Sequence, residues 1–321
     1  MFAVRGIAVS FSIFVLLYGA LSLAVWGVWR RVWLASQRYS TRSCADLLLA
    51  LRLLPFVLAN GVTLALAVPS FLLLEPRAVD EPMGAAPLVL GLFGIAVLFA
   101  GMWKAAAAWL QASRTIAGWS REARLAGYGP ADSRGTVSVL RIPGATPALT
   151  VAGILRPGVW LSGAAEFVLT ERELKTALRH EAVHIRRRDN LRKLILRLVT
   201  FPGMAELESA WRDATEMAAD DAAVSSASQA LDLAAAVIKL SRLTPLEPPA
   251  ELTTALVHSP AESVNARVER LIAWTEWRQI PAPGYSFVYP LCAAAVVVVT
   301  LAITYSQLLV RVHAATEWLV R

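Results

Sequence analysis

Four long apolar stretches alternate with polar sequence along the chain. About 20 helical residues cross the hydrocarbon core of a bilayer, and each stretch is at least that long. The pattern therefore predicts four transmembrane helices, three of them within residues 1–110, and Pro55 and Pro69 predict a kink in the second. The four predicted spans are residues 7–29, 53–74, 87–110 and 286–310.

The first stretch also has the position of a signal peptide, which is the alternative to a membrane anchor. Its apolar run is too long for a signal peptide, and it ends in Trp26, Trp29, Arg30 and Arg31, without a small-residue cleavage site. Tryptophans followed by arginines are typical of the end of a span at the membrane surface. We therefore expect a retained anchor.

The charges between the spans predict their orientation. Residues 30–46 hold four arginines against one aspartate, whereas residues 75–86 hold three acidic residues against one arginine. Short loops rich in Lys and Arg remain on the cytoplasmic side. We expect the N-terminus outside, residues 111–285 in the cytoplasm, and a short extracytoplasmic tail at 311–321.

The segment between the third and fourth spans has the length and patterning of one mixed α/β domain. Residues 135–163 are rich in β-branched residues and broken by Gly and Pro, which predicts two or three short strands. A single long helix is predicted after Thr170, where Thr170 and Glu173 form a capping box, and it ends before Pro202. Three further helices are predicted, at 205–227, 229–242 and 261–277.

The composition agrees with a membrane protein. Hydrophobic residues make up 56% of the chain and the mean hydropathy is +0.53, both high for a soluble domain. Much of the formal charge of +7 lies beside the apolar stretches, so we do not expect direct nucleic-acid binding. Cys44 and Cys292 lack the C-x-x-C spacing of a metal or redox site and indicate no oxidising compartment.

The sequence H-E-A-V-H at 180–184 predicts a zinc site. On a helix, His180 and His184 lie one turn apart on one face, so both imidazoles can reach one ion. Glu181 points to one side, where its carboxylate can act as a general base on a water that the metal activates. The alternative is a charged amphipathic helix, but the chain has only four histidines, and this spacing is rare by chance.

A third ligand is predicted on the following helix. Glu216 and Asp220 lie four residues apart, which suits Glu216 as the ligand and Asp220 as the partner of a histidine N–H. The alternative is an ordinary acidic helix face, with Asp213 and Asp221 as the neighbouring candidates.

Three motifs together resemble the BlaR/MecR-type integral membrane metallopeptidases. They are GILRPGVWL, LTERELKTALRHEAVHIRRRDNL and EMAADDAAV, within residues 153–224. The resemblance implies a gluzincin fold, with His180, His184 and Glu216 as ligands of one Zn²⁺ and Glu181 as the base. Two departures are visible: Ala219 stands where the family often has Cys, and no penicillin-binding sensor domain follows the fourth span, so antibiotic sensing is not expected.

Several other residues have two alternative interpretations each. Asp189 either braces the site or forms a surface ion pair, and His258 either stabilises the oxyanion or has no role, while His313 is not a ligand candidate. Strand segment 150–162 is expected either to pair with an extended substrate as an edge strand or to be ordinary core. The basic helix after His184 either lies on anionic lipid or packs on the domain; its basic residues are Arg186, Arg187, Arg188, Arg192, Lys193 and Arg197.

The expected function is a zinc-dependent endopeptidase, multi-pass in the bacterial cytoplasmic membrane. The resemblance implies cleavage of a cytoplasmic protein such as a transcriptional repressor, or of the chain itself, in signal transduction. The alternatives are an HtpX-like quality-control protease and a non-catalytic signalling protein with a structural zinc, against which Glu181 argues. The expected partners are a protein or peptide substrate, the lipid bilayer and, as one option, a second copy in a homodimer.

Overall fold

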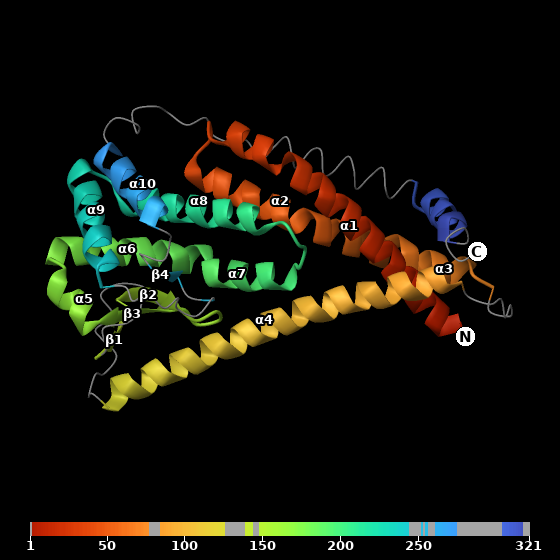
Figure 1. Ribbon diagram of the computed structural model, residues 1–321, viewed down its shortest axis with the longest axis horizontal. Coiled ribbons are helices and arrows are strands. Elements are labelled where there is room, and N and C mark those ends of the chain that lie inside the picture. The colour runs from red at the N-terminus through yellow and green to blue at the C-terminus, as the bar shows by residue number, and fades with distance from the viewer. Residues whose placement is uncertain are drawn as a thin grey trace.

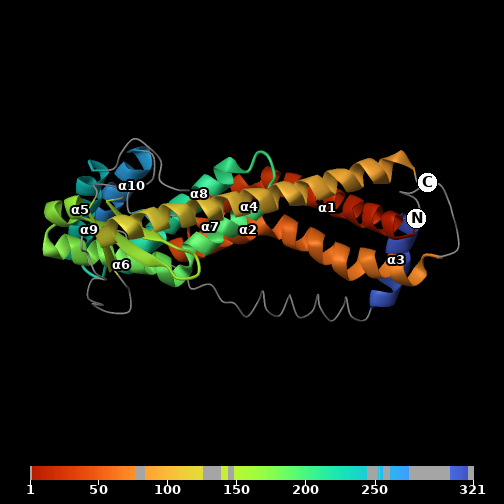
Figure 2. The same cartoon turned by 90° about the horizontal axis from the view of Figure 1, so that it is seen from below.

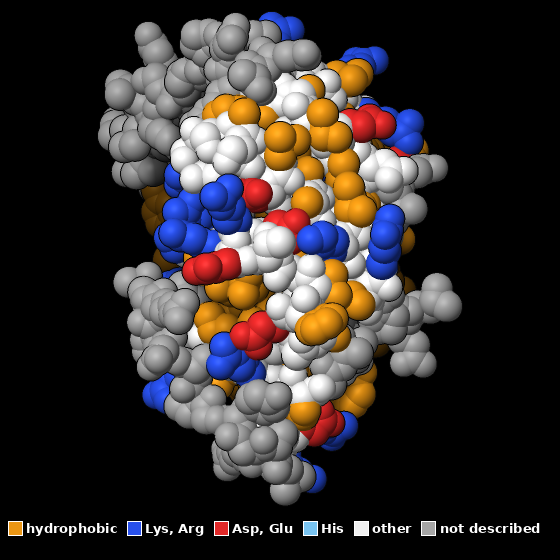
Figure 3. Space-filling view, turned by 90° about the vertical axis from the view of Figure 1, so that its left-hand side faces the viewer, with side chains coloured by type: hydrophobic (Ala, Val, Ile, Leu, Met, Phe, Trp, Pro, Cys, Tyr) orange, Lys and Arg blue, Asp and Glu red, His pale blue; other side chains and the backbone are white. Residues whose placement is uncertain are grey.

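The computed structural model is elongated, with apolar helices at one end and a small mixed domain at the other (Figures 1 and 2). Helices α7 and α8 lie between the two ends. The end formed by α5, α6 and α9 mixes charged and apolar side chains on its surface (Figure 3). The structure describes residues 2–76, 84–125, 139–143, 148–243, 252, 254–255, 261–274 and 304–316.

Three helices in this described part of the chain are long and apolar enough to cross a membrane. They contain the first three predicted spans, which are confirmed as apolar helices, and they extend beyond them. Many large apolar side chains on them are exposed, such as Leu73 and Trp103. Most of the predicted fourth span, 286–303, lies outside the described residues. The helices are α1 (Phe2–Ser36), the run α2 (Thr41–Val62), η1 (Thr63–Ala67) and α3 (Val68–Leu74), and α4 (Ala85–Leu125).

The second apolar helix is irregular near Pro69, as the prolines predict. A π-helical turn, η1, precedes α3, and Pro69 has no N–H to donate to the carbonyl of Ala65. The hydroxyl of Tyr305 donates to that carbonyl at 2.7 Å. Tyr305 belongs to the helical segment 304–316, so this segment lies against the second apolar helix.

A small four-stranded sheet forms the base of the mixed domain, in the order β1-β3-β2-β4. Strand β3 pairs in parallel with β1 and antiparallel with β2, and β2 pairs antiparallel with β4. Two or three strands are predicted within 135–163, and the structure has three there, β1, β2 and β3. The edge position expected for 150–162 is wrong, because β2 and β3 are both hydrogen-bonded on two sides. The strands are β1 (Val139–Ile142), β2 (Leu149–Ala152), β3 (Gly158–Ser162) and β4 (Thr254–Ala255).

Alternating side chains of the sheet enter two separate cores. Val159 and Leu161 pack with α6 and α9, whereas Trp160 packs against the far end of α4, where its ring lies 5.6 Å from that of Trp119. One continuous helix therefore joins the apolar end of the molecule to the sheet. The remaining helices are α5 (Gly163–Val168), α6 (Glu171–Arg187), α7 (Asp189–Leu198), α8 (Ala205–Ala223), α9 (Ala227–Ser241) and α10 (Ala261–Ile272).

The long helix predicted after Thr170 is two helices, α6 and α7. Its capping box is confirmed: the Thr170 hydroxyl accepts from the Glu173 N–H, and the Glu173 carboxylate accepts from the Thr170 N–H. The break occurs at Arg188, whose φ of 54° is left-handed and rare for a residue with a side chain. Asp189 follows this residue directly and begins α7, with its Oδ2 2.7 Å from Nδ1 of His184.

The turn between α7 and α8 lies among the three apolar helices. Tyr18 of α1 donates to the carbonyl of Thr200 at 2.8 Å, and the Thr200 hydroxyl donates to the carbonyl of Val97 in α4 at 3.4 Å. The ring of Phe201 packs edge-on against Tyr18. Tyr18 and Val97 lie near the middle of the first and third predicted spans, so this turn lies level with the middle of those two apolar segments.

Arg52 forms hydrogen bonds to polar groups that this turn places among apolar side chains. It is 3% exposed, donates to the carbonyl of Val199 at 2.6 Å and pairs with Glu208 at 3.1 Å. A buried guanidinium is stable only when it is paired and hydrogen-bonded. Arg52 thus links α2 to both ends of the α7–α8 turn.

Gly101 allows α4 to approach the last turn of α7. A Cβ at this position would overlap the carbonyl oxygen of Leu198, which is backbone and cannot rotate away. Gly118 on the same helix has nothing within 4 Å of the corresponding position.

The close approach at Gly101 predicts opposite effects for two identical substitutions. Gly101→Ala is expected to destabilise the protein by about 1–3 kcal/mol, because the backbones must separate. Gly118→Ala is expected to stabilise it by about 0.5–1 kcal/mol, as alanine does in a helix interior. Thermal unfolding of both variants in one detergent tests this, and equal midpoints would show that the contact at Gly101 is not tight.

Candidate metal centre

Two imidazoles on α6 converge on one point. His180 and His184 are 0% and 1% exposed, and their Nε2 atoms lie 3.0 Å apart. The helical spacing of four residues places both rings on the face of α6 that packs against α8. The predicted pair is therefore assembled inside the domain.

Glu216 of α8 completes the cluster. Its Oε2 lies 3.5 Å from Nε2 of His180, and its Oε1 lies 3.6 Å from Nε2 of His184. Ligands about 2.0–2.1 Å from a tetrahedral zinc ion are about 3.3 Å from one another, close to the observed separations. His180, His184 and Glu216 could therefore hold a metal ion, and their donor set, two imidazoles and a carboxylate, is one that catalytic zinc sites use.

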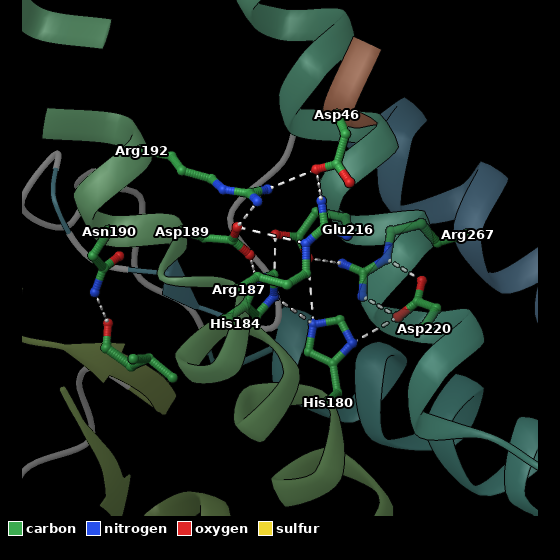
Figure 4. A network of polar contacts seen from close by, with 11 residues as sticks. Asp46, His180, His184, Arg187, Asp189, Asn190, Arg192, Glu216, Asp220 and Arg267 are labelled. Carbon is green, nitrogen blue, oxygen red and sulfur yellow. Dashed lines mark hydrogen bonds and ion pairs between the residues drawn. The ribbon is translucent and has the colours of Figure 1, made fainter. Parts of the chain in front are cut away.

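Each histidine is oriented by a carboxylate on its other nitrogen. Nδ1 of His180 lies 2.9 Å from Asp220 Oδ1, and Nδ1 of His184 lies 2.7 Å from Asp189 Oδ2 (Figure 4). Such contacts keep the proton on Nδ1 and turn Nε2 toward the metal. Asp220 and Asp189 thus lie where the sequence analysis expected an orienting group and a brace.

Asp189 is in turn connected to the second apolar helix. Arg187 and Arg192 each lie 3.7 Å from Asp189 and bind Asp46 of α2 at 3.2 and 3.0 Å (Figure 4). Asn190 donates to the carbonyls of Val151 and Gly153 and so holds the start of α7 against β2. The basic helix after His184 therefore directs several of its arginines into the domain, although Arg186 and Arg188 are exposed.

Arg267 of α10 is a site residue that the sequence analysis missed. It is 1% exposed, binds both oxygens of Asp220 at 2.8 and 2.7 Å, and lies 3.1 Å from Oε2 of Glu216. One arginine among 31 Lys and Arg residues carries no spacing signal that would single it out. Its predicted helix, 261–277, corresponds to α10.

The charges of this network favour a cation between the ligands. Burial raises the pKa of Glu216, but His184 and Arg267 outweigh this effect and lower it to about 2. Burial lowers the pKa of His180, yet Asp220 and Glu216 raise it to about 9. The site thus attracts positive charge, and a metal ion competes with a proton for His180.

Glu181 is buried beside the ligands. It is 0% exposed, and neither carboxylate oxygen has a hydrogen-bond partner among the described residues. Burial raises the pKa of Glu181 to about 8, and the nearby His180 opposes that rise. An unpaired buried carboxylate is costly to the fold, so its place next to the ligands suits a group that exchanges a proton there.

The other predicted candidates lie elsewhere. Asp213 accepts from Ser263, and Asp221 binds Arg270 of α10, so neither competes with Glu216 for the ligand position. His313 lies 3.8 Å from Glu75 at the far end of the molecule. His258 lies outside the described residues.

Comparison with known proteins does not assign a family. A scan against family models found no match, and a search of curated proteins found none. The resemblance to the BlaR/MecR-type peptidases therefore stays a hypothesis drawn from the quoted motifs. Three helices able to cross a membrane and a cluster able to hold a metal are what the structure supports directly.

The cluster predicts about one zinc per chain. The double variant His180→Ala, His184→Ala is expected to lose the metal, because a single carboxylate remains. His313→Ala is the control and should retain it. Elemental analysis after dialysis of the purified protein measures the metal content, and zinc that survives the double substitution would refute the assignment.

A substitution at Asp189 is expected to have a smaller effect on zinc binding. Asp189→Asn keeps the size of the side chain but removes the charge that orients His184, and is expected to weaken zinc binding about 10–100-fold. Asp213→Asn, whose parent carboxylate binds only Ser263 among the contacts described, should bind zinc as the wild type does. Competition with a chelator measures both affinities, and equal values would exclude an orienting role for Asp189.

Proposed function

We propose that the chain is an integral membrane zinc metalloendopeptidase. The observation that carries the proposal is the position of Glu181 beside His180, His184 and Glu216: its carboxylate is buried and has no hydrogen-bond partner among the described residues. The three candidate ligands found among the described residues would leave a fourth position open, as in catalytic sites, whereas structural zinc sites are closed by four. A structural site also has no use for a carboxylate between its two histidines.

Each group of residues in the site has its own role in peptide hydrolysis. His180, His184 and Glu216 would hold the ion, which when bound supplies a Lewis acid that activates water and polarises the scissile carbonyl. In its ionised form, which a bound cation beside it would favour, Glu181 accepts a proton from the attacking water and passes it to the leaving amine. Asp189 and Asp220 keep the two imidazoles in position throughout.

The active site is proposed to work close to the cytoplasmic surface of the membrane. Asp46, which binds Arg187 and Arg192, precedes the predicted start of the second span by seven residues, or about 10 Å of helix. The α7–α8 turn lies among the three apolar helices, which supports the same placement of the active site beside the membrane. Four spans, an external N-terminus and a cytoplasmic domain at 111–285 complete the proposed topology.

The resemblance favours a cytoplasmic protein as the target, such as a transcriptional repressor, or the chain itself, within a signalling pathway. An HtpX-like role in membrane-protein quality control is the alternative target class for the same chemistry. A neighbouring gene for a small winged-helix repressor would favour signalling, whereas a heat-shock context would favour quality control.

The mechanism predicts that Glu181→Gln retains zinc and loses peptide hydrolysis by about 10²–10⁴-fold, the usual contribution of a general base. Mass spectrometry of new protein N-termini in cells that express wild type or Glu181→Gln measures the loss and identifies the substrates. The His180→Ala, His184→Ala variant is the metal-free control. Cleavage products that persist unchanged with Glu181→Gln would refute the mechanism.

A further inference from the structure

We propose that Arg267 is a positioning residue of the metal centre, which orients His180 through Asp220 and restricts Glu216 to giving the metal one oxygen. The inference deepens the proposed function and rests on it, since it concerns how the same ligands bind the ion. It also gives α10, which contributes no ligand, a defined part in metal binding.

The guanidinium of Arg267 reaches two acidic groups at once. Its Nε and Nη2 donate to the two oxygens of Asp220 in a bidentate pair, while Nη1 lies 3.1 Å from Oε2 of Glu216. Asp220 then contacts Nδ1 of His180 at 2.9 Å. One planar side chain thus acts on two of the three ligands, which a lysine, a single point charge on a flexible stem, cannot reproduce.

The contact with Glu216 affects the number of ligands. A carboxylate that gives both oxygens to zinc would occupy the position that catalysis needs for water. In the structure Oε2 of Glu216 lies 3.1 Å from Nη1 of Arg267 and 3.5 Å from Nε2 of His180, while Oε1 lies 3.6 Å from Nε2 of His184 and has no contact with Arg267 among those described. The ion pair with Arg267 would hold Oε2 back from a bound ion, so that Glu216 would give it Oε1 alone and leave the fourth position for water.

The competing explanation is that Arg267 only fastens α10 to α8. The chain contains a matched pair that separates the two roles. One residue further along α8, Asp221 forms a bidentate pair with Arg270 of the same α10, at 2.7 and 2.9 Å. Asp221 also accepts from the Thr41 hydroxyl. Among the described contacts, the Asp221–Arg270 pair joins the same two helices and includes none of the candidate metal ligands.

The test compares Arg267→Lys with Arg270→Lys in the purified full-length protein. Chelator competition measures the affinity for zinc, and visible absorption of the Co²⁺-loaded protein reports the coordination number. Arg267→Lys is expected to bind zinc about 10–100-fold more weakly and to show the weaker absorption of five-coordinate cobalt. Arg270→Lys is expected to match the wild type in both measurements, even where its unfolding temperature falls equally.

Each result decides between the two roles. Wild-type affinity and spectrum in Arg267→Lys, or equal losses in both variants, would overturn the positioning role and leave the proposed peptidase intact. A wild-type protein that takes up neither Zn²⁺ nor Co²⁺ would overturn the peptidase proposal as well. Arg267→Gln, which keeps two N–H donors without the charge, replaces the lysine variant with the same expectations if that variant does not fold.

Discussion

A charge that is removed from water must meet an opposite charge, and the candidate metal centre is built around this constraint. Arg267 and Asp220 are both almost fully buried, and each would destabilise the domain without the other. Their pairing joins α8 to α10. Oδ1 of Asp220, which binds Arg267, also lies 2.9 Å from Nδ1 of His180. The arrangement of the ligands thus depends on an interaction that contains none of them.

The same constraint connects the domain to the apolar helices. Arg52, inside a helix of membrane-spanning character, finds its partners in Val199 and Glu208, on either side of the α7–α8 turn. Arg187 and Arg192 share Asp46 with Asp189, which contacts a histidine of the cluster. The mixed domain is therefore joined to the apolar helices by paired charges as well as by packing at the α7–α8 turn.

Patterns of short range were readable from the sequence, and contacts of long range were not. Apolar length predicted the three helices, and the spacing of His180 and His184 predicted a shared face, because both follow from helix geometry. Nothing in the sequence predicted the left-handed conformation of Arg188, since glycine or asparagine is usual at such a turn. The interior position of β2 and β3 depends on pairing with strands distant in sequence, and Arg267 depends on the docking of α10.

Because α4 is one continuous helix, a rotation at one of its ends displaces the other end. From Gly101, where it touches α7, to Ala123, where it touches the sheet, the helix runs about 33 Å without interruption. A tilt of roughly 10° about that contact would carry its far end about 6 Å, more than the spacing between two strands. Small angular changes of α4 at the apolar end would thus become larger displacements at the sheet of the mixed domain.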